Sequence, residues 1–327
     1  MTPSENALVP VVTTPAVLAL DELARVQSYL DAGVAKATKR AYAASWSTWT
    51  TWCGARGAVP LPASPELLAI WLTERAAAGA APASLERHLA AIVGAHHAAD
   101  LASPRAHPAV RAVLRGIRRT HGIAQRQVRP LRVEDLLAAL PRGDGPRAVR
   151  DRALLLIGFA GALRRSELVA LDVADLESRP EGLALTIRSS KTDPEARGEV
   201  LGIPRARRPD LCPVAAVVAW RAVFEGTGAP VVGPLFRPVN RHGRIAPARL
   251  SDRAVADLVK EAAERAGLDP LAYAGHSLRA GFATSAAAAG VPERDIMRQT
   301  RHRSIAVFRA YVRQGAIFVD NPVARIL

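Results

Sequence analysis

The sequence predicts a mainly α-helical protein of two domains, an N-terminal helical bundle and an α-rich second domain with a small β-hairpin. Three observations support this prediction. The chain has 327 residues, of which 49% are apolar, so it can bury more than one hydrophobic core. Apolar residues recur at steps of three and four over most of its length, which is the period of amphipathic helices. Strand-like alternation is confined to one stretch between residues 182 and 203.

The first domain is expected to span residues 14–120, after a flexible tail at residues 1–13 that lacks an apolar period. A helix is predicted from Thr38 to Gly54, because large apolar side chains recur along it at helical spacing. An aromatic stripe can also stack on bases, but at helical spacing we expect it to form the core. Its members are Tyr42, Trp46, Trp49 and Cys53.

Two more helices are predicted from a serine cap beside a proline. Ser64 precedes Pro65, and Ser84 follows Pro82. A fourth helix follows Pro108, with an apolar face formed by Val110, Val113, Leu114 and Ile117.

The stretch from Ser103 to Pro130 contains seven arginines and no acidic residue, whereas a solvated helix face usually mixes both signs. We therefore interpret its arginines as nucleic-acid contacts in preference to a merely solvated face. The predicted DNA-binding residues are Arg111, Arg115, Arg118, Arg119, Arg126 and Arg129.

Residues 121–130 have no apolar period and end in proline, so they are predicted to link the first domain to a second at residues 131–327. Two strands, at residues 183–189 and 199–203, are predicted to form a hairpin with Lys191 near its tip. The remaining periodic segments are predicted helices, at residues 133–140, 148–159, 166–171, 213–224, 251–266, 277–289, 292–299 and 304–312.

The composition points to a polyanionic partner. Lys and Arg outnumber Asp and Glu by 44 to 30, and the excess is mostly arginine, whose planar fork suits phosphate. A GC-rich genome would produce the same bias. Two cysteines, Cys53 and Cys212, make a disulfide framework or a structural zinc site improbable. Without a long apolar run or an export signal, we expect a cytoplasmic protein that contacts no membrane.

Three short motifs contain residues that could bind or attack a phosphate. They are residues 161–168 (Gly-Ala-Leu-Arg-Arg-Ser-Glu-Leu), residues 275–281 (Gly-His-Ser-Leu-Arg-Ala-Gly), and residues 300–304 (Thr-Arg-His-Arg-Ser), which Tyr311 follows. The first places Ser166 where it can cap a helix. The second puts His276 and Arg279 three residues apart at a helix start, on one face and close to unpaired N–H groups. Each motif alone also fits an ordinary role: a surface arginine pair, a capping histidine or a core tyrosine.

In their order and spacing the motifs resemble the catalytic domain of the tyrosine recombinases, the lambda-integrase family that includes Cre and the Xer recombinases. The resemblance covers nearly the whole chain, because the helical first domain is similar to the family's SAM-like core-binding domain. With only about 30 residues before Thr38, the chain is similar to the simpler, Cre-like members. Ala280 and Gly281 stand where some relatives carry a basic residue or a histidine, which we interpret as tolerated variation.

The resemblance implies a role for each matching residue. Arg164 and Arg279 would bind the non-bridging phosphate oxygens, and Arg165 is rejected because the family's arginine directly follows Leu163. Glu167 would support the active site by orienting an arginine or a histidine. The reacting groups would be Tyr311 as nucleophile, His276 as its proton acceptor, His302 as a phosphate ligand and Lys191 as the acid that protonates the leaving 5′ oxygen.

The resemblance implies a protein of bacterial or phage origin that associates with the nucleoid. The family chemistry stores the bond energy in a 3′-phosphotyrosine, so we expect no cofactor and no metal. The partner would be a double-stranded DNA site with inverted half-sites, bound by a homotetramer on two paired sites, with the apolar C-terminal tail docked on a neighbouring protomer. Two alternatives stay open. One is a type IB topoisomerase or telomere resolvase with the same covalent chemistry, and the other is a DNA-binding relative that has lost catalysis.

Overall fold

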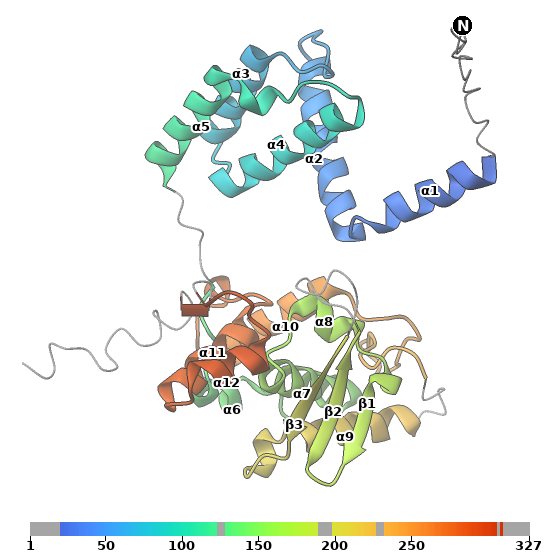
Figure 1. The fold of residues 1–327 in the computed structure, drawn as a ribbon. Coiled ribbons are helices and arrows are strands. Elements are labelled where there is room, and N and C mark those ends of the chain that lie inside the picture. Colours follow the sequence, from blue (N-terminus) through green and yellow to red (C-terminus); the bar gives the residue numbers. More distant parts are fainter. Residues whose placement is uncertain (1–19, 123–127, 189–197, 227–231, 306–307, 310–327) are drawn as a thin grey trace, which may run out of the picture. The chain divides into compact units, whose positions relative to one another are not determined.

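The computed structural model describes residues 20–122, 128–188, 198–226, 232–305 and 308–309. The chain divides into two compact units, residues 1–126 and residues 127–327, which are described separately. Both are mainly helical, and the second unit also holds a three-stranded sheet, which confirms the predicted fold class (Figure 1). The predicted tail at residues 1–13 lies outside the described residues.

The first unit is a helical bundle with one core. Its helices are α1 (Leu20–Ala32), α2 (Lys36–Gly54), α3 (Pro65–Ala77), α4 (Pro82–Ala98) and α5 (Pro108–His121). Trp49 lies at the centre, stacked on Trp52 and edge-on to Trp71, as expected for aromatic rings that share a core. The predicted stripe was wrong at its first member, since Tyr42 remains 37% exposed. Helix α1 was not predicted.

One of the two predicted serine caps forms. The Ser64 hydroxyl accepts a hydrogen bond from the Leu67 backbone N–H at 3.3 Å, and Pro65 opens α3. The prediction for Ser84 was wrong, because α4 already begins at Pro82, and Ser84 lies inside its first turn. Proline fits the first turn of a helix because that turn leaves the N–H groups unpaired in any case.

The second unit is built around a buried helix, α7. Its helices are α6 (Val133–Ala139), α7 (Pro146–Ala160), α8 (Arg165–Ala170), α9 (Pro213–Glu225), α10 (Asp252–Arg265), α11 (Ser277–Ala288) and α12 (Glu293–Thr300). Helix α7 contacts both α9 and α11, and most of its residues are buried. Such burial on all sides explains why residues 153–159 read as an almost continuous apolar run.

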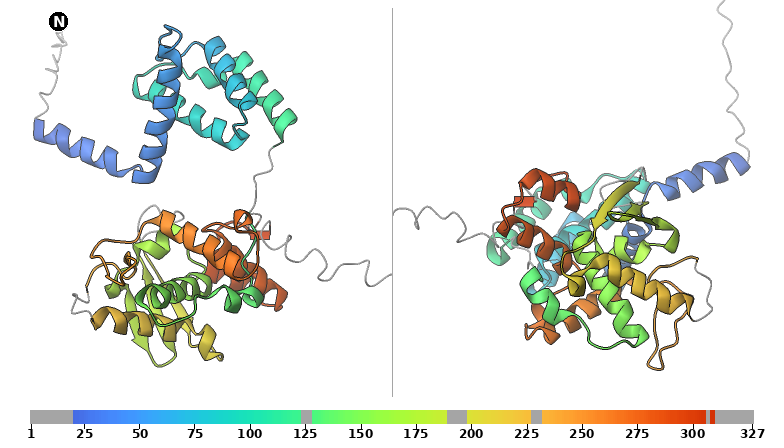
Figure 2. Two further views of the ribbon diagram at one scale, coloured as in Figure 1. Left: turned by 180° about the vertical axis from the view of Figure 1, so that it is seen from behind. Right: turned by 90° about the horizontal axis from the view of Figure 1, so that it is seen from below.

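The sheet has three antiparallel strands in the order β1 (Leu176–Arg179), β2 (Gly182–Ile187) and β3 (Glu199–Pro204). The predicted hairpin is confirmed as β2 and β3, and α9 runs beside the sheet and contacts β3 (Figure 2). Strand β1 was not predicted, because only four residues form it and three of them are exposed. Lys191 lies outside the described residues.

Gly281 allows α11 to pack directly on the chain segment that enters the second unit. A Cβ atom at this position would lie 1.8 Å from the Leu131 carbonyl oxygen, a distance no side chain can tolerate. The Leu131 backbone N–H also donates to the Ser277 carbonyl oxygen at 3.0 Å. The interpretation of Gly281 as tolerated variation was therefore wrong, because this packing requires glycine.

The predicted helix at residues 304–312 is described only in part. Phe308 is fully buried, against Ile296 of α12 and Ala283 of α11. Tyr311 and the predicted docking tail lie outside the described residues. Among the helices that the structure describes, none has both the length and the apolar character needed to cross a bilayer.

Candidate active site

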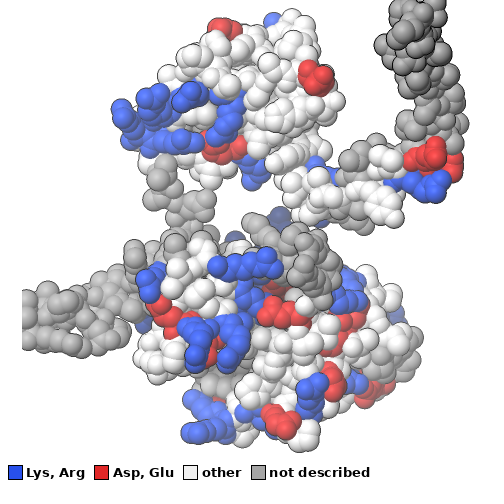
Figure 3. All heavy atoms as spheres, viewed as in Figure 1, with Lys and Arg blue, Asp and Glu red and all other residues white. Residues whose placement is uncertain are grey.

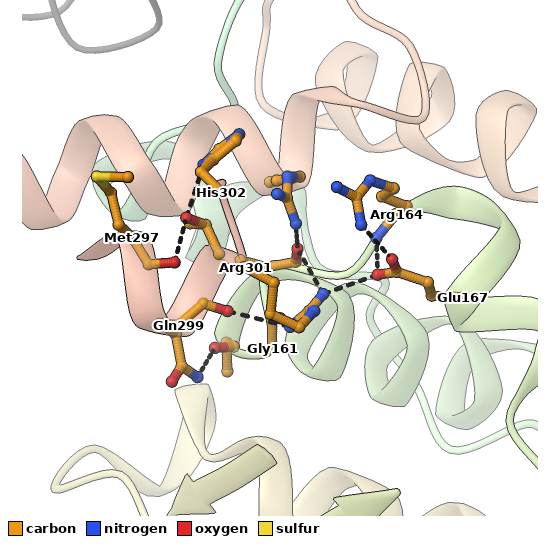
Figure 4. Close-up of polar contacts among 11 residues, drawn as sticks. Gly161, Arg164, Glu167, Met297, Gln299, Arg301 and His302 are labelled. Carbon is orange, nitrogen blue, oxygen red and sulfur yellow. Dashed lines mark hydrogen bonds and ion pairs between the residues drawn. The ribbon is translucent and has the colours of Figure 1, made fainter. Parts of the chain in front are cut away.

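Three segments that are far apart in the sequence meet in the second unit: the turn between α7 and α8, the start of α11, and the turn that follows α12. Each contains one of the three motifs singled out in the sequence. They form a small cluster in which Arg164 and Arg301 both pair with Glu167 and Arg279 donates to a backbone oxygen of the first turn (Figure 4). The cluster is built mainly from guanidinium groups around one carboxylate.

The turn between α7 and α8 carries Arg164. Helix α7 ends at Ala160, and Ala162 adopts a positive φ of 44°, which reverses the chain within two residues. Arg164 then occupies the N-cap of α8, where its backbone N–H donates to Glu167 Oε2 at 2.9 Å. Glu167 therefore caps the helix that Ser166 was predicted to cap, because a carboxylate three residues beyond the N-cap reaches that N–H group.

Glu167 is 3% exposed and holds two guanidinium groups. Its Oε1 accepts from Arg164 Nη1 at 2.5 Å, and its Oε2 accepts from Arg301 Nη2 at 2.7 Å (Figure 4). Burial alone would raise the pKa of Glu167, but the charge of Arg301 and the hydrogen bonds from Arg164 outweigh it and lower the pKa. The carboxylate is thus ionised at neutral pH and fixes both arginines.

Arg279 enters the cluster from α11. His276 is the N-cap of this helix and is exposed, whereas Arg279, one turn further on, is 3% exposed. Arg279 Nη1 donates to the Ala162 carbonyl oxygen at 2.8 Å, so the turn that presents Arg164 also anchors Arg279. Two arginines from segments 115 residues apart are in this way tied to one turn.

His302 completes the cluster from the turn after α12. Its Nδ1 lies 2.7 Å from the Thr300 hydroxyl oxygen, and this hydroxyl donates to the Ile296 carbonyl oxygen at 2.8 Å. Burial, together with the charges of Arg279, Arg164 and Arg301, lowers the pKa of His302 to about 4, so its ring is neutral at pH 7. The tautomer with its proton on Nε2 can donate to an anion, and it requires the Thr300 hydroxyl to turn its single proton from Ile296 to Nδ1.

The depressed pKa predicts that His302 makes the fold sensitive to mild acid. In the unfolded chain the ring gains a proton near pH 6.5, but in the folded chain only near pH 4, so its contribution is complete above pH 6.5 and is lost between these values. We expect the stability difference between wild type and His302→Gln to shrink by about 1–2 kcal/mol from pH 7 to pH 5, after allowance for partial solvent screening. Denaturant unfolding at both pH values measures this, and a difference independent of pH would contradict it.

Arg301 was not among the predicted site residues. It is 7% exposed, and besides Glu167 it donates from Nη1 to the Gly161 and Gln299 carbonyl oxygens, at 3.1 and 3.0 Å. The only signal in the sequence was its position between Thr300 and His302, inside a motif already singled out. Arg165, which was rejected, is partly exposed and pairs with Asp252 at 3.0 Å.

Comparison with known proteins places this cluster in a family. A family model described as "Phage integrase family" matches residues 235–316. The sequence is also 40% identical over 303 residues to an integrase/recombinase XerD homolog of Selenomonas ruminantium, an alignment that covers 91% of this chain and 87% of that protein. The chain belongs to the phage integrase family of tyrosine recombinases. This confirms the family that the motifs had indicated.

Three further matches are tyrosine recombinases or integrases. Tyrosine recombinase XerD of Xanthomonas axonopodis pv. citri is 34% identical over 187 residues, 55% of this chain and 55% of that protein. Two solved structures share the fold at low identity. A XerH recombinase bound to palindromic difH substrate has a TM-score of 0.56 at 16% identity, over 81% of this chain and 71% of that one. A lambda integrase (75–356) dimer bound to a COC′ core site has a TM-score of 0.55 at 18% identity, over 89% and 93%.

The predicted DNA-binding arginines of this tyrosine recombinase separate into two sets. Exposed arginines of α5 line a groove on the first unit, where basic side chains gather at one end of the bundle (Figure 3). Glu86 of α4 pairs with Arg118 and, at 2.7 Å, with Arg105. An acidic side chain from another helix therefore lies beside this groove, although residues 103–130 contain no acidic residue. Arg129 belongs to the second unit, and Arg126 lies outside the described residues.

The two remaining predicted residues of the recombinase site, Lys191 and Tyr311, also lie outside the described residues. The described part of the recombinase brings together Arg164, Glu167, Arg279 and His302, and it leaves His276 exposed at the start of α11. Within that part there is no group of three or more His, Cys, Asp or Glu side chains arranged to hold a metal ion.

Proposed function

We propose that this tyrosine recombinase is a site-specific DNA recombinase that cleaves and rejoins DNA through a covalent bond between Tyr311 and a 3′ phosphate. One observation carries the proposal. Arg164 and Arg279 are anchored to the same turn, with a neutral His302 close enough for both charges to lower its pKa. Two guanidinium groups and one neutral N–H donor match the two non-bridging oxygens of a phosphodiester.

The proposed reaction uses only side chains of this chain. The Tyr311 oxygen attacks the phosphorus atom and gives its proton to His276, while Lys191 protonates the 5′ oxygen as the bond from phosphorus to that oxygen breaks. Arg164, Arg279 and His302 Nε2 bind the non-bridging oxygens, whose negative charge grows in the transition state. A 5′ hydroxyl of a second strand then attacks the phosphotyrosine, which reverses these steps and joins the new strand. Repeated on both strands, this exchange passes through a Holliday junction.

We assign residues 14–120 to a core-binding domain, residues 121–130 to a linker and residues 131–327 to the catalytic domain. Support comes from the division of the chain into two compact units at residue 126 and from the basic groove on α5. The proposed substrate has inverted half-sites, held by a homotetramer whose C-terminal tails dock on neighbours. The XerH structure holds a palindromic substrate, and the lambda integrase structure is a dimer on a core site. Such an enzyme would act on DNA of the nucleoid.

If α5 binds the DNA backbone, single arginines in its groove will contribute mainly through charge. Arg115→Ala is expected to weaken binding about equally for all DNA sequences and to reduce the slope of log affinity against log salt by about 1. Arg87→Ala, an exposed arginine of α4 outside the groove, is the matched control. DNA-binding titrations at several salt concentrations measure the affinity and its salt dependence for each variant. An unchanged slope for Arg115→Ala would show that this face of α5 does not contact the DNA backbone.

The experiment that tests the proposed function begins with a pool of nicked duplexes that carry randomised half-sites. Protein that remains attached to DNA after denaturation identifies the cleaved site, and two differently labelled duplexes with this site are then mixed with the enzyme. A recombinase produces strands that combine both labels. A topoisomerase would relax supercoiled plasmid without combining labels, and a protein that binds DNA but forms no adduct would be a non-catalytic relative. Either result would refute the proposal.

A further inference from the structure

Arg301 sits in a backbone conformation that favours glycine. Its φ is 56° and its ψ 41°, in the left-handed region, where it ends α12. The His302 backbone N–H donates to the Met297 carbonyl oxygen at 3.1 Å, and the Arg301 N–H to the Arg298 carbonyl oxygen at 3.2 Å. This pair of bonds is the helix-ending arrangement in which glycine is most common, because glycine has no Cβ to clash with the backbone. Because this backbone conformation is unfavourable for arginine, the contacts of the Arg301 side chain must account for the residue at this position.

The side chain of Arg301 turns inward, to the turn that presents Arg164 (Figure 4). It is the second guanidinium on Glu167, and its Nη2 also lies 3.4 Å from the Ala162 carbonyl oxygen, which accepts from Arg279 as well. A buried carboxylate held by Arg164 alone would neutralise one of the two arginines proposed to bind phosphate. Arg301 supplies a second positive charge for the same carboxylate.

The charges of the cluster can be compared with those of the reaction. Arg164, Arg279 and Arg301 are positive, Glu167 is negative and His302 is neutral, so two positive charges are in excess. A phosphodiester carries one negative charge, and its five-coordinate transition state after attack by a deprotonated tyrosine carries about two. Without Arg301 the excess within this cluster would fall to one, so the cluster would offset less of the negative charge that develops on the phosphate.

We propose that Arg301 is a positioning residue that offsets the charge of Glu167, so that Arg164 and Arg279 keep their full positive field for the transition state. This inference rests on the proposed function. It assigns a role to a residue that the family motif did not indicate, and it predicts that the loss of Arg301 slows cleavage without weakening DNA binding.

Arg301→Gly tests the proposal cleanly, because glycine suits the left-handed backbone and the fold is expected to survive. Each variant is incubated with nicked duplexes of the selected site, made either with a normal phosphodiester or with a methylphosphonate at the cleaved position. The methyl group replaces one charged oxygen, so the transition state loses one negative charge. We expect Arg301→Gly to cleave the phosphodiester about 10-fold more slowly than wild type, and the methylphosphonate with a clearly smaller deficit.

Two further variants and a stability measurement complete the test. Arg301→Lys restores the charge and is expected to recover part of the rate, while Arg294→Ala, an exposed arginine of the same helix, should cleave like wild type. Wild-type rates for Arg301→Gly would overturn the proposal. So would equal deficits on both substrates together with a lower melting temperature, because that pattern indicates a purely structural role. If wild type itself forms no adduct, the proposed function fails, and the role of Arg301 fails with it.

Discussion

Replacement of Arg279 by alanine is expected to slow covalent cleavage of DNA by about 10²- to 10³-fold, the usual cost of losing one donor to a charged transition state. Arg279 is almost fully buried and is held by the Ala162 carbonyl oxygen, so its guanidinium is oriented before substrate arrives. Such preorganisation favours the transition state more than the bound substrate. DNA affinity should therefore change little, because the other basic groups proposed to bind the DNA backbone are unchanged.

Single-turnover cleavage of a nicked duplex measures this effect, with DNA binding followed on the same preparation. Arg165→Ala is the matched control, since Arg165 neighbours Arg164 but is partly exposed and pairs with Asp252. The control should lose little activity. A cleavage rate for Arg279→Ala within about threefold of wild type would show that Arg279 does not contact the reacting phosphate.

Replacement of Glu167 by alanine is expected to lower the free energy of unfolding of the second unit by about 3–5 kcal/mol. The substitution leaves two guanidinium groups facing each other without their shared carboxylate, and it also removes the N-terminal cap of α8. Glu167→Gln keeps the shape and part of the hydrogen bonding, so its loss should be smaller. Both variants should also cleave slowly, because Arg164 loses the group that orients it.

Hydrogen exchange of peptides from residues 127–327 reports the stability of the second unit separately from the first. Glu177→Ala serves as the control, because Glu177 forms an exposed ion pair with Arg179, and solvent-exposed ion pairs contribute little to stability. Equal stability of Glu167→Ala and Glu177→Ala would contradict the claim that the Glu167 carboxylate stabilises the cluster.

Local signals were the ones that could be read reliably from the sequence. Ser64 caps α3 because the hydroxyl, the following proline and the helix start lie within four residues. The alternation that indicated the hairpin appears as alternating burial in β3, whereas β2 is buried at five of its six residues. Arg164, Glu167, Arg279 and His302 were selected by their motifs, and the structure gathers them around one turn.

Features that depend on tertiary contact could not be read in this way. Glu86 joins the basic groove from another helix, 32 residues from Arg118. Strand β1 is short and polar, and its pairing with β2 defines it. Arg301 looked like a further basic residue in a basic segment, because nothing local shows that its side chain is buried on a carboxylate 134 residues away. Tyr42 fits the helical stripe, but at the start of α2 it stays exposed.

The measurement that tests the central claim most directly is the chemical identity of the residue that becomes attached to DNA. Adduct trapped on the selected nicked duplex is digested with nuclease and trypsin, and the nucleotide-bearing peptide is sequenced by mass spectrometry. Trypsin cuts after Arg309 and Arg313, so Tyr311 is released in the four-residue peptide Ala-Tyr-Val-Arg. We predict that this peptide carries a 3′-linked phosphate and that Tyr311→Phe forms no adduct. A phosphate on any other residue, or an adduct that persists in Tyr311→Phe, would contradict the account.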